Sequence, residues 1–228
     1  MIKAVLFDLD NTLIDFMKLK KKSCEAAIKA MINNGLQLDE KKAMHILFDL
    51  YDKYGIEHGK IFQKFLLRTK GRIDWKILTA GIVAYRRIQA DYRKPYPDVP
   101  RVLRLLKNKG LKLGVVSDAP SLKAWIRLNE IKIADFFDVV IAYDETKRKK
   151  PHELPFRAAI KKLGIKPEEI LFVGDNPKND INGAKKLGMK TALALYGIQG
   201  KFKKYMLKYR ADYAINNVKE ILDIVDEA

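Results

Sequence analysis

Two aspartates, Asp8 and Asp10, directly follow a short apolar run, Ala4 to Phe7, near the start of the chain. An apolar run of this length is typical of a strand buried in the middle of a parallel sheet. Side chains alternate along a strand, so the pattern places both carboxylates on the same side. Neighbouring carboxylates repel each other, and a divalent cation with hard oxygen ligands would compensate for that repulsion. The same residue types are also common in solvated turns, so this stretch alone leaves both interpretations open.

Further reactive side chains follow later apolar runs. Ser117 and Asp118 follow one expected strand, Asp175 and Asp180 follow another, and Lys150 lies in a lysine-rich run between them. Each has an ordinary explanation when taken singly: a turn, a helix N-cap for Asp180, or a solvated charged face for Lys150. In an open parallel sheet, however, ligands lie beyond the carboxyl ends of the strands. We therefore expect acids, a hydroxyl and a lysine to collect along one edge of the sheet.

The elements that must position these residues alternate between strands and helices from position 96 onward. Strands are expected at residues 4–7, 113–116, 139–142, 170–173, 191–195 and 213–215. Helices are expected between them, at residues 99–109, 121–129, 180–187 and 218–225, with one more that has Pro155 in its first turn and runs to Leu163. This alternation predicts an open parallel sheet with helices on both faces.

Residues 15–95 interrupt this pattern with helices only, two of which Asp39 and Asp74 are expected to cap. The sequence therefore predicts an α/β core of residues 1–14 and 96–228 and a helical insert of residues 15–95. An insert tethered directly after the first aspartates can close over a site as a lid and exclude water. The candidate substrate contacts in the insert are Tyr85, Arg86, Arg87 and the lysines within residues 18–22.

Composition narrows the class of protein. A hydrophobic content of 48% over 228 residues is enough for a sizeable core, and one cysteine excludes a disulfide framework. Without a signal peptide or an apolar run of roughly 20 residues, we expect a cytoplasmic protein with no membrane partner. The net charge of +17 permits nucleic-acid binding or steering of anions. Because the basic residues are spread along the whole chain, a generally basic or heat-adapted surface is the favoured interpretation.

Four short motifs occur in order along the chain. The segment Asp8 to Thr12 reads DLDNT, Ser117 follows a strand, Lys150-Pro151 has Phe156 six residues after the lysine, and Gly174 to Asp180 reads GDNPKND. With these motifs the chain resembles hydrolases of the haloacid dehalogenase (HAD) superfamily that carry a helical cap after the first motif. The resemblance implies a Rossmann-like three-layer α/β sandwich with a parallel sheet and an inserted α-helical cap. Within that family, the whole sequence is similar to archaeal phosphatases of glyceraldehyde 3-phosphate.

The resemblance also implies roles for single residues, in a Mg²⁺-dependent phosphatase that works through an aspartyl-phosphate intermediate. Asp8 is then the nucleophile, Asp10 the general acid and base, and Lys150 and Ser117 hold the phosphoryl group. The implied metal ligands are Asp8, Asp10 through its carbonyl, Asp175, and Asp180 from behind or through water. The implied substrate-binding positions are Asn11, Thr12, Ser117, Asp118 and Lys150.

The chain departs from the family pattern after Ser117, where Asp118-Ala119-Pro120 stands in place of Asn-Gly or Asp-Gly. This difference leaves the role of Asp118 open. Lys149 also competes with Lys150 for the role of the motif lysine, and the adjacent Pro151 favours Lys150.

Several functions compete on this fold. The leading hypothesis is a phosphatase of a small phosphorylated metabolite, such as glyceraldehyde 3-phosphate or another sugar or triose phosphate. A haloacid dehalogenase is disfavoured by Asp10, since a halide leaves without protonation. A pure binding protein is disfavoured because every motif carries its chemical group. The basic charge keeps a phosphatase of nucleic-acid ends as the alternative, although a nucleic-acid partner is not the favoured one. The oligomeric state, monomer or homodimer, stays open.

Overall fold

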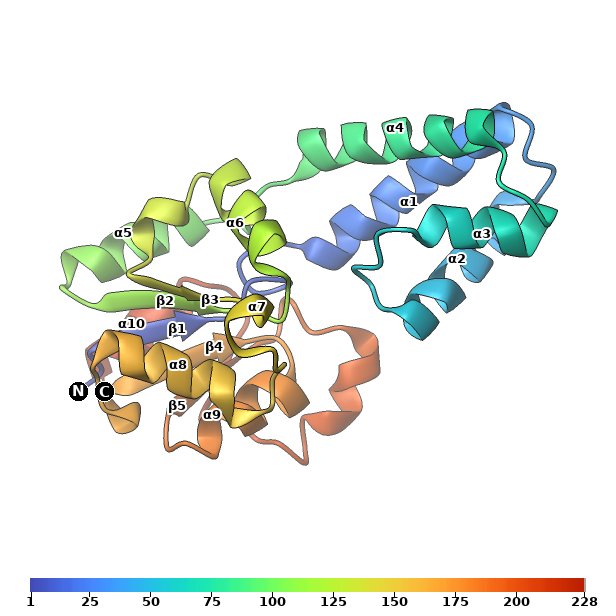
Figure 1. Ribbon diagram of the computed structural model, residues 1–228. Coiled ribbons are helices and arrows are strands. Elements are labelled where there is room, and N and C mark those ends of the chain that lie inside the picture. The colour runs from blue at the N-terminus through green and yellow to red at the C-terminus, as the bar shows by residue number, and fades with distance from the viewer. Residues whose placement is uncertain (228) are drawn as a thin grey trace. The chain divides into compact units, whose positions relative to one another are not determined.

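A six-stranded parallel sheet forms the middle of the larger of two compact units. In the computed structural model, which describes residues 1–227, the strand order is β3-β2-β1-β4-β5-β6. The strands are β1 (Ala4–Phe7), β2 (Lys112–Val116), β3 (Val139–Ile141), β4 (Ile170–Gly174), β5 (Lys190–Ala194) and β6 (Tyr213–Ile215). All neighbouring strands pair in parallel, and Figure 1 shows the dark blue β1 beside β2. The four residues of β1 are fully buried, as predicted for an inner strand.

Helices cover both faces of this sheet, which confirms the predicted α/β sandwich. On one face, Phe156 of α8 and Ala184 of α9 pack with Leu6 and Phe172 in a single apolar cluster. On the other face, α5 packs against β2 and α10 packs against α5 (Figure 1). The helices of this unit are α5 (Val99–Asn108), α6 (Ser121–Glu130), α7 (Tyr143–Thr146), α8 (Glu153–Leu163), α9 (Asn182–Lys185) and α10 (Glu220–Glu227). The short helical turns are η1 (Ala134–Phe136), η2 (Pro167–Glu169), η3 (Pro177–Ile181) and η4 (Gly200–Tyr205).

The second compact unit, Phe16–Arg93, is helical. Its helices are α1 (Phe16–Asn33), α2 (Glu40–Tyr54), α3 (Ile61–Lys70) and α4 (Trp75–Tyr92). Asp39 and Asp74 cap α2 and α4 as predicted, since their carboxylates accept hydrogen bonds from the backbone of the first turn. This unit lies within the predicted cap of residues 15–95. The division into that cap and a core of residues 1–14 and 96–228 stays a prediction. Within residues 1–227, no helix is both long and apolar enough to cross a membrane.

One helix begins earlier than the sequence predicts. We expected a helix over residues 180–187 with Asp180 as its N-cap, but η3, a wide π-helical turn, starts at Pro177 and continues into α9. The N-cap is Asn176, whose side chain accepts hydrogen bonds from two backbone amides. Proline suits the first turn of a helix and asparagine caps as well as aspartate does, so the start moves to this pair. The carboxylate of Asp180, which lies inside the turn, points back and accepts from the amide of Asn176.

Candidate active site

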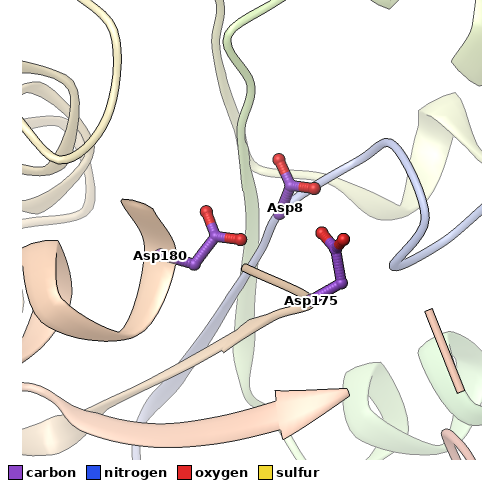
Figure 2. A group of neighbouring side chains, drawn as sticks. All are labelled: Asp8, Asp175 and Asp180. Carbon is purple, nitrogen blue, oxygen red and sulfur yellow. The ribbon is translucent and has the colours of Figure 1, made fainter. Parts of the chain in front are cut away.

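The carboxyl ends of β1 and β4 bring three aspartates together. Asp8, Asp175 and Asp180 are all buried, and one carboxylate oxygen of each lies within 4.8 Å of those of the other two. Asp8 directly follows β1, and its amide continues the ladder by donating to the carbonyl of Val173, 2.8 Å away. Asp175 directly follows β4, and Asp180 reaches the same place from η3. Figure 2 shows the three carboxylates grouped around a common space.

Asp180 can reach this cluster because Gly174 has no side chain. A Cβ at position 174 would lie 2.5 Å from Cβ of Asp180 and 2.6 Å from its Oδ2. Real Cβ atoms do not approach other atoms this closely. The glycine of the GDNPKND motif therefore makes room for the last aspartate of the same motif.

Lys150 joins two members of the acidic cluster. Its Nζ lies 2.5 Å from Oδ1 of Asp8 and 2.7 Å from Oδ1 of Asp180, and it also donates to the carbonyl of Val116 at 2.8 Å. Burial alone would lower the pKa of Lys150, but the charges of Asp180, Asp8 and Asp118 outweigh it and raise the pKa well above its usual range. The lysine is therefore held as a cation. Lys149, by contrast, is exposed.

The β2–α6 loop positions Lys150 and presents a hydroxyl. The carboxylate of Asp118 accepts a hydrogen bond from the backbone amide of Lys150 at 2.8 Å. Burial raises the pKa of Asp118, and Lys150 opposes that rise. Ser117 is also buried, and its Oγ accepts from the amide of Ala119, which leaves the hydroxyl proton available for donation. Asp118 thus fixes the backbone that carries Lys150. The predicted contact of Asp118 with substrate stays a prediction.

The acidic cluster carries more negative charge than Lys150 compensates. Burial, followed by the charges of Asp8 and Asp180, raises the pKa of Asp175 well above its ordinary value. Burial and the charge of Asp8 raise the pKa of Asp180 to about 7 even though Lys150 opposes the shift. Converging buried carboxylates are the hard oxygen donors that Mg²⁺ and similar cations prefer. These residues therefore fit a divalent metal ion, which would supply the missing positive charge.

Asp10 lies outside the acidic cluster. Its Oδ2 accepts a hydrogen bond from Nη1 of Arg127 at 2.7 Å, and the arginine side chain is only 6% exposed. The predicted metal contact through the carbonyl of Asp10 stays a prediction. Sequence reasoning missed Arg127, although one signal was available: in α6 it lies on the same buried face as Ala124 and Leu128. An arginine within an apolar stripe needs a buried acidic partner.

The loop after Asp8 is in contact with the loop that follows β5. Oγ1 of Thr12 lies 3.5 Å from Oδ2 of Asp8, and the carbonyl of Thr12 accepts a hydrogen bond from the hydroxyl of Tyr196 at 3.0 Å. Asn11 is buried in a left-handed conformation, with φ of 64°. Its carbonyl faces Gly197, a residue that the sequence analysis also missed. The loop after β5 therefore fixes the shape of the loop that carries Asp8.

Comparisons with known proteins agree with this fold. The family model for haloacid dehalogenase-like hydrolases matches residues 5–194. A glyceraldehyde 3-phosphate phosphatase of Methanocaldococcus jannaschii is 39% identical over 99% of this chain and 97% of the relative. Another, of Pyrococcus furiosus, is 34% identical over 99% and 93%. The HAD hydrolase YfnB of Bacillus subtilis, solved with bound magnesium, has the same fold, with a TM-score of 0.70, 17% identity and 99% coverage of both chains.

The extent of these matches settles the family. The family model covers all three aspartates of the cluster and Lys150, and it also includes the helical segment between β1 and β2. The curated relatives align over nearly the whole chain. From its fold, its acidic cluster and these matches, the chain belongs to the haloacid dehalogenase-like hydrolases.

Proposed function

We propose that this protein is a magnesium-dependent phosphatase of small phosphorylated metabolites, with glyceraldehyde 3-phosphate as the first substrate to test. The observation that carries the proposal is the placement of Asp8: a buried carboxylate beside the cation of Lys150, within an acidic cluster. The choice of a triose phosphate is supported by the relatives of that name, which match over nearly the whole chain.

Asp8 is the proposed nucleophile. A carboxylate that approaches a phosphate dianion to about 4 Å is opposed by roughly 8 kcal/mol at an effective dielectric constant of about 20. Lys150 reduces this barrier because its ammonium, 2.5 Å from Oδ1 of Asp8, places a positive charge beside the nucleophile. A metal ion held by Asp8 and Asp175, with Asp180 beside them, would neutralise further charge on the phosphoryl group.

The neighbouring residues orient the reacting groups. Ser117 has a hydroxyl proton available to donate to a phosphoryl oxygen, because its own oxygen accepts from Ala119. Thr12 lies against the second oxygen of Asp8 and restricts the rotation of its carboxylate. Both residues therefore limit the ways in which nucleophile and phosphorus can meet.

Asp10 is the proposed general acid and base. As Oδ of Asp8 forms its bond to phosphorus, the ester bond breaks and the proton of Asp10 passes to the leaving alkoxide oxygen. Asp10 then takes a proton from a water molecule whose oxygen attacks phosphorus. This second step releases inorganic phosphate and restores the carboxylate of Asp8.

Two assays test the proposal. The wild-type protein should hydrolyse three- to six-carbon sugar or triose phosphates in a screen of phosphorylated metabolites with Mg²⁺, releasing inorganic phosphate. Asp8→Asn keeps the shape of the side chain and removes the attacking anion, so turnover should become undetectable while circular dichroism shows a folded protein. An Asp8→Asn protein with a tenth of wild-type activity would rule out the aspartyl-phosphate route.

A specific surface feature favours one alternative substrate, the phosphorylated end of an oligonucleotide. Lysines and aromatic rings lie together at η3 and η4: Nζ of Lys178 and Lys204 lie 5.8 and 5.2 Å from the centroid of the Tyr205 ring. Nζ of Lys208 likewise lies 5.5 Å from the centroid of the Tyr209 ring. Basic and aromatic side chains together suit single-stranded nucleic acid.

The test compares a triose phosphate with a 3′-phosphorylated oligonucleotide at two salt concentrations. A polymer bound along the surface releases counterions, so kcat/KM for it should fall steeply with salt. Steering of a small anion is only modestly sensitive to salt. We expect the triose phosphate to be preferred, and preference for the oligonucleotide at low salt would favour the alternative.

A further inference from the structure

We infer that Arg127 is the positioning residue for Asp10: its guanidinium holds the carboxylate of Asp10 apart from the acidic cluster, where it serves proton transfer and not metal binding. The inference rests on the proposed function, because it assigns Arg127 a role in the acid and base chemistry of Asp10. It concerns a residue that lies in none of the four sequence motifs.

Arg127 and Asp10 form a close ion pair. Nη1 of Arg127 lies 2.7 Å from Oδ2 of Asp10, within the range of a charge-assisted hydrogen bond. The arginine side chain is 6% exposed and that of Asp10 is 23% exposed. A buried guanidinium needs an acid in contact with it, and Asp10 supplies that acid. The side chain of Asp10 is less enclosed than that of the arginine, as suits a residue that exchanges protons with substrate and water.

The position of Asp10 in the chain explains why it needs a partner. It lies two residues after Asp8, which belongs to the cluster of buried aspartates together with Asp175 and Asp180. A carboxylate tethered so close to a divalent metal site is itself a hard oxygen ligand. Arg127 offers a competing cation away from the cluster, so the carboxylate of Asp10 is directed away from metal coordination.

The helix that carries Arg127 is anchored to the same side of the site. Helix α6 starts four residues after Ser117, and its first amide, on Ser121, donates to Oδ2 of Asp144 at 2.6 Å. Arg127 comes from the buried face of this helix, where Ala124 and Leu128 pack against the core. The β2–α6 segment therefore presents both the hydroxyl of Ser117 and the cation that holds Asp10.

Loss of Arg127 should lower catalysis by misplacing Asp10, its ion-pair partner. A misplaced general acid matters most when the leaving group is poor, and general acid catalysis typically contributes roughly 100-fold or more. We expect Arg127→Met to lower kcat about 100-fold on an alkyl phosphate and only a few-fold on p-nitrophenyl phosphate. KM should change little on either substrate. Arg127→Lys keeps a cation and should recover part of the loss.

A double-mutant cycle with Asp10→Asn tests whether the two residues act as a unit. In the Asp10→Asn background, Arg127→Met should produce no further selective loss on the alkyl phosphate. Arg101→Met, in exposed surface of α5, is the matched control and should leave both activities unchanged. A thermal melt of each variant shows whether it is folded at the assay temperature. If Arg127→Met is not folded there, Arg127→Lys replaces it in the comparison.

Three outcomes overturn the inference. One is an equal loss on both substrates, and another is a full additional loss in the Asp10→Asn background. The third is a large rise in KM at constant kcat, which would make Arg127 a substrate contact. The proposed function fails in a different way, through absence of Mg²⁺-dependent phosphatase activity in the wild-type protein or its persistence in Asp8→Asn.

Discussion

Gly197 lies directly against the carbonyl oxygen of Asn11: a Cβ on this glycine would be 1.6 Å from that oxygen and 3.2 Å from Cβ of Asp175. The glycine thus permits the loop after β5 to pack between the two loops that carry Asp8 and Asp175. The backbone of Asn11 is already left-handed, with φ of 64°, so a further change of its conformation away from Gly197 would be strained.

Gly197→Ala should therefore lower activity without unfolding the protein. The added methyl group must push the loop of Asn11 aside and move Asp8 with it, and misplacement of reacting groups by about 1 Å can cost roughly 100-fold in rate. The measurement is kcat on the preferred substrate, together with the melting temperature. Gly200→Ala is the matched control in the same loop, because a Cβ there would meet nothing within 4 Å. Equal kcat values for the two variants would contradict this account.

Lys150→Met should damage both stability and catalysis. It keeps the length of the side chain but leaves the carboxylates of Asp8 and Asp180 without their shared cation. Removing one partner of a buried ion pair costs about 3–5 kcal/mol of unfolding free energy, and turnover should be lost with it. Lys149→Met is the control, since this exposed lysine should contribute within about 0.5 kcal/mol. Denaturant unfolding and kcat of the two variants decide which lysine serves the site.

Asp175→Ala should abolish the use of metal. Loss of residues that merely orient metal ligands costs about 10- to 100-fold, so loss of a carboxylate from the cluster should cost at least that much. Additional Mg²⁺ should restore little of the activity. Asp135 is exposed, so Asp135→Ala is the control. Its activity should depend on Mg²⁺ concentration as that of the wild type does. If EDTA leaves the wild-type enzyme fully active, the assignment of a metal site is wrong.

The acidic cluster also predicts how metal stabilisation depends on pH. Because the pKa values of Asp175 and Asp180 are raised in the folded protein, the metal-free fold binds more protons than the unfolded chain does. Its stability should therefore fall as pH rises from about 4, the ordinary aspartate value, to about 7. Metal binds the deprotonated carboxylates, so the rise in melting temperature on adding Mg²⁺ should be larger at pH 8 than at pH 5.5.

Asp180→Asn provides the control for this titration. The amide does not ionise, so the metal-free variant should lose less stability than the wild type over the same pH interval. A Mg²⁺-induced shift of equal size at both pH values would show that protons and metal do not compete for the cluster.

Much of the fold followed from local patterns. The apolar run Ala4 to Phe7 and the later strands produced the parallel sheet because inner strands of such sheets are apolar on both faces. The caps Asp39 and Asp74 were also evident, since capping depends on neighbouring residues alone. The start of the helix after β4 was predicted wrongly because Asn176 and Asp180 are both good capping residues. Only the backbone hydrogen bonds of the folded turn distinguish them.

The motif residues of the site were predicted for a related reason. Asp8 and Asp175 follow strand ends, and parallel strands place those ends along one edge. Arg127 and Gly197 follow no such rule. The arginine meets Asp10 across 117 positions of sequence from within a helix, and the glycine is required by a backbone contact between two loops. Contacts of this kind become evident only when the chain is assembled.

The position of β1 also has a consequence for folding kinetics. Val5 pairs with Leu113 on one side and Leu171 on the other, so both neighbours of the strand that leads to Asp8 are more than a hundred residues away in sequence. Contacts this distant form slowly, because a long loop must close before any pairing stabilises it. The acidic cluster needs β1 beside β4, so it cannot exist in a chain in which these two strands have not yet paired. During refolding, the gain of metal affinity should therefore come late, after helical signal has largely returned, and would report the pairing of β1 with β4.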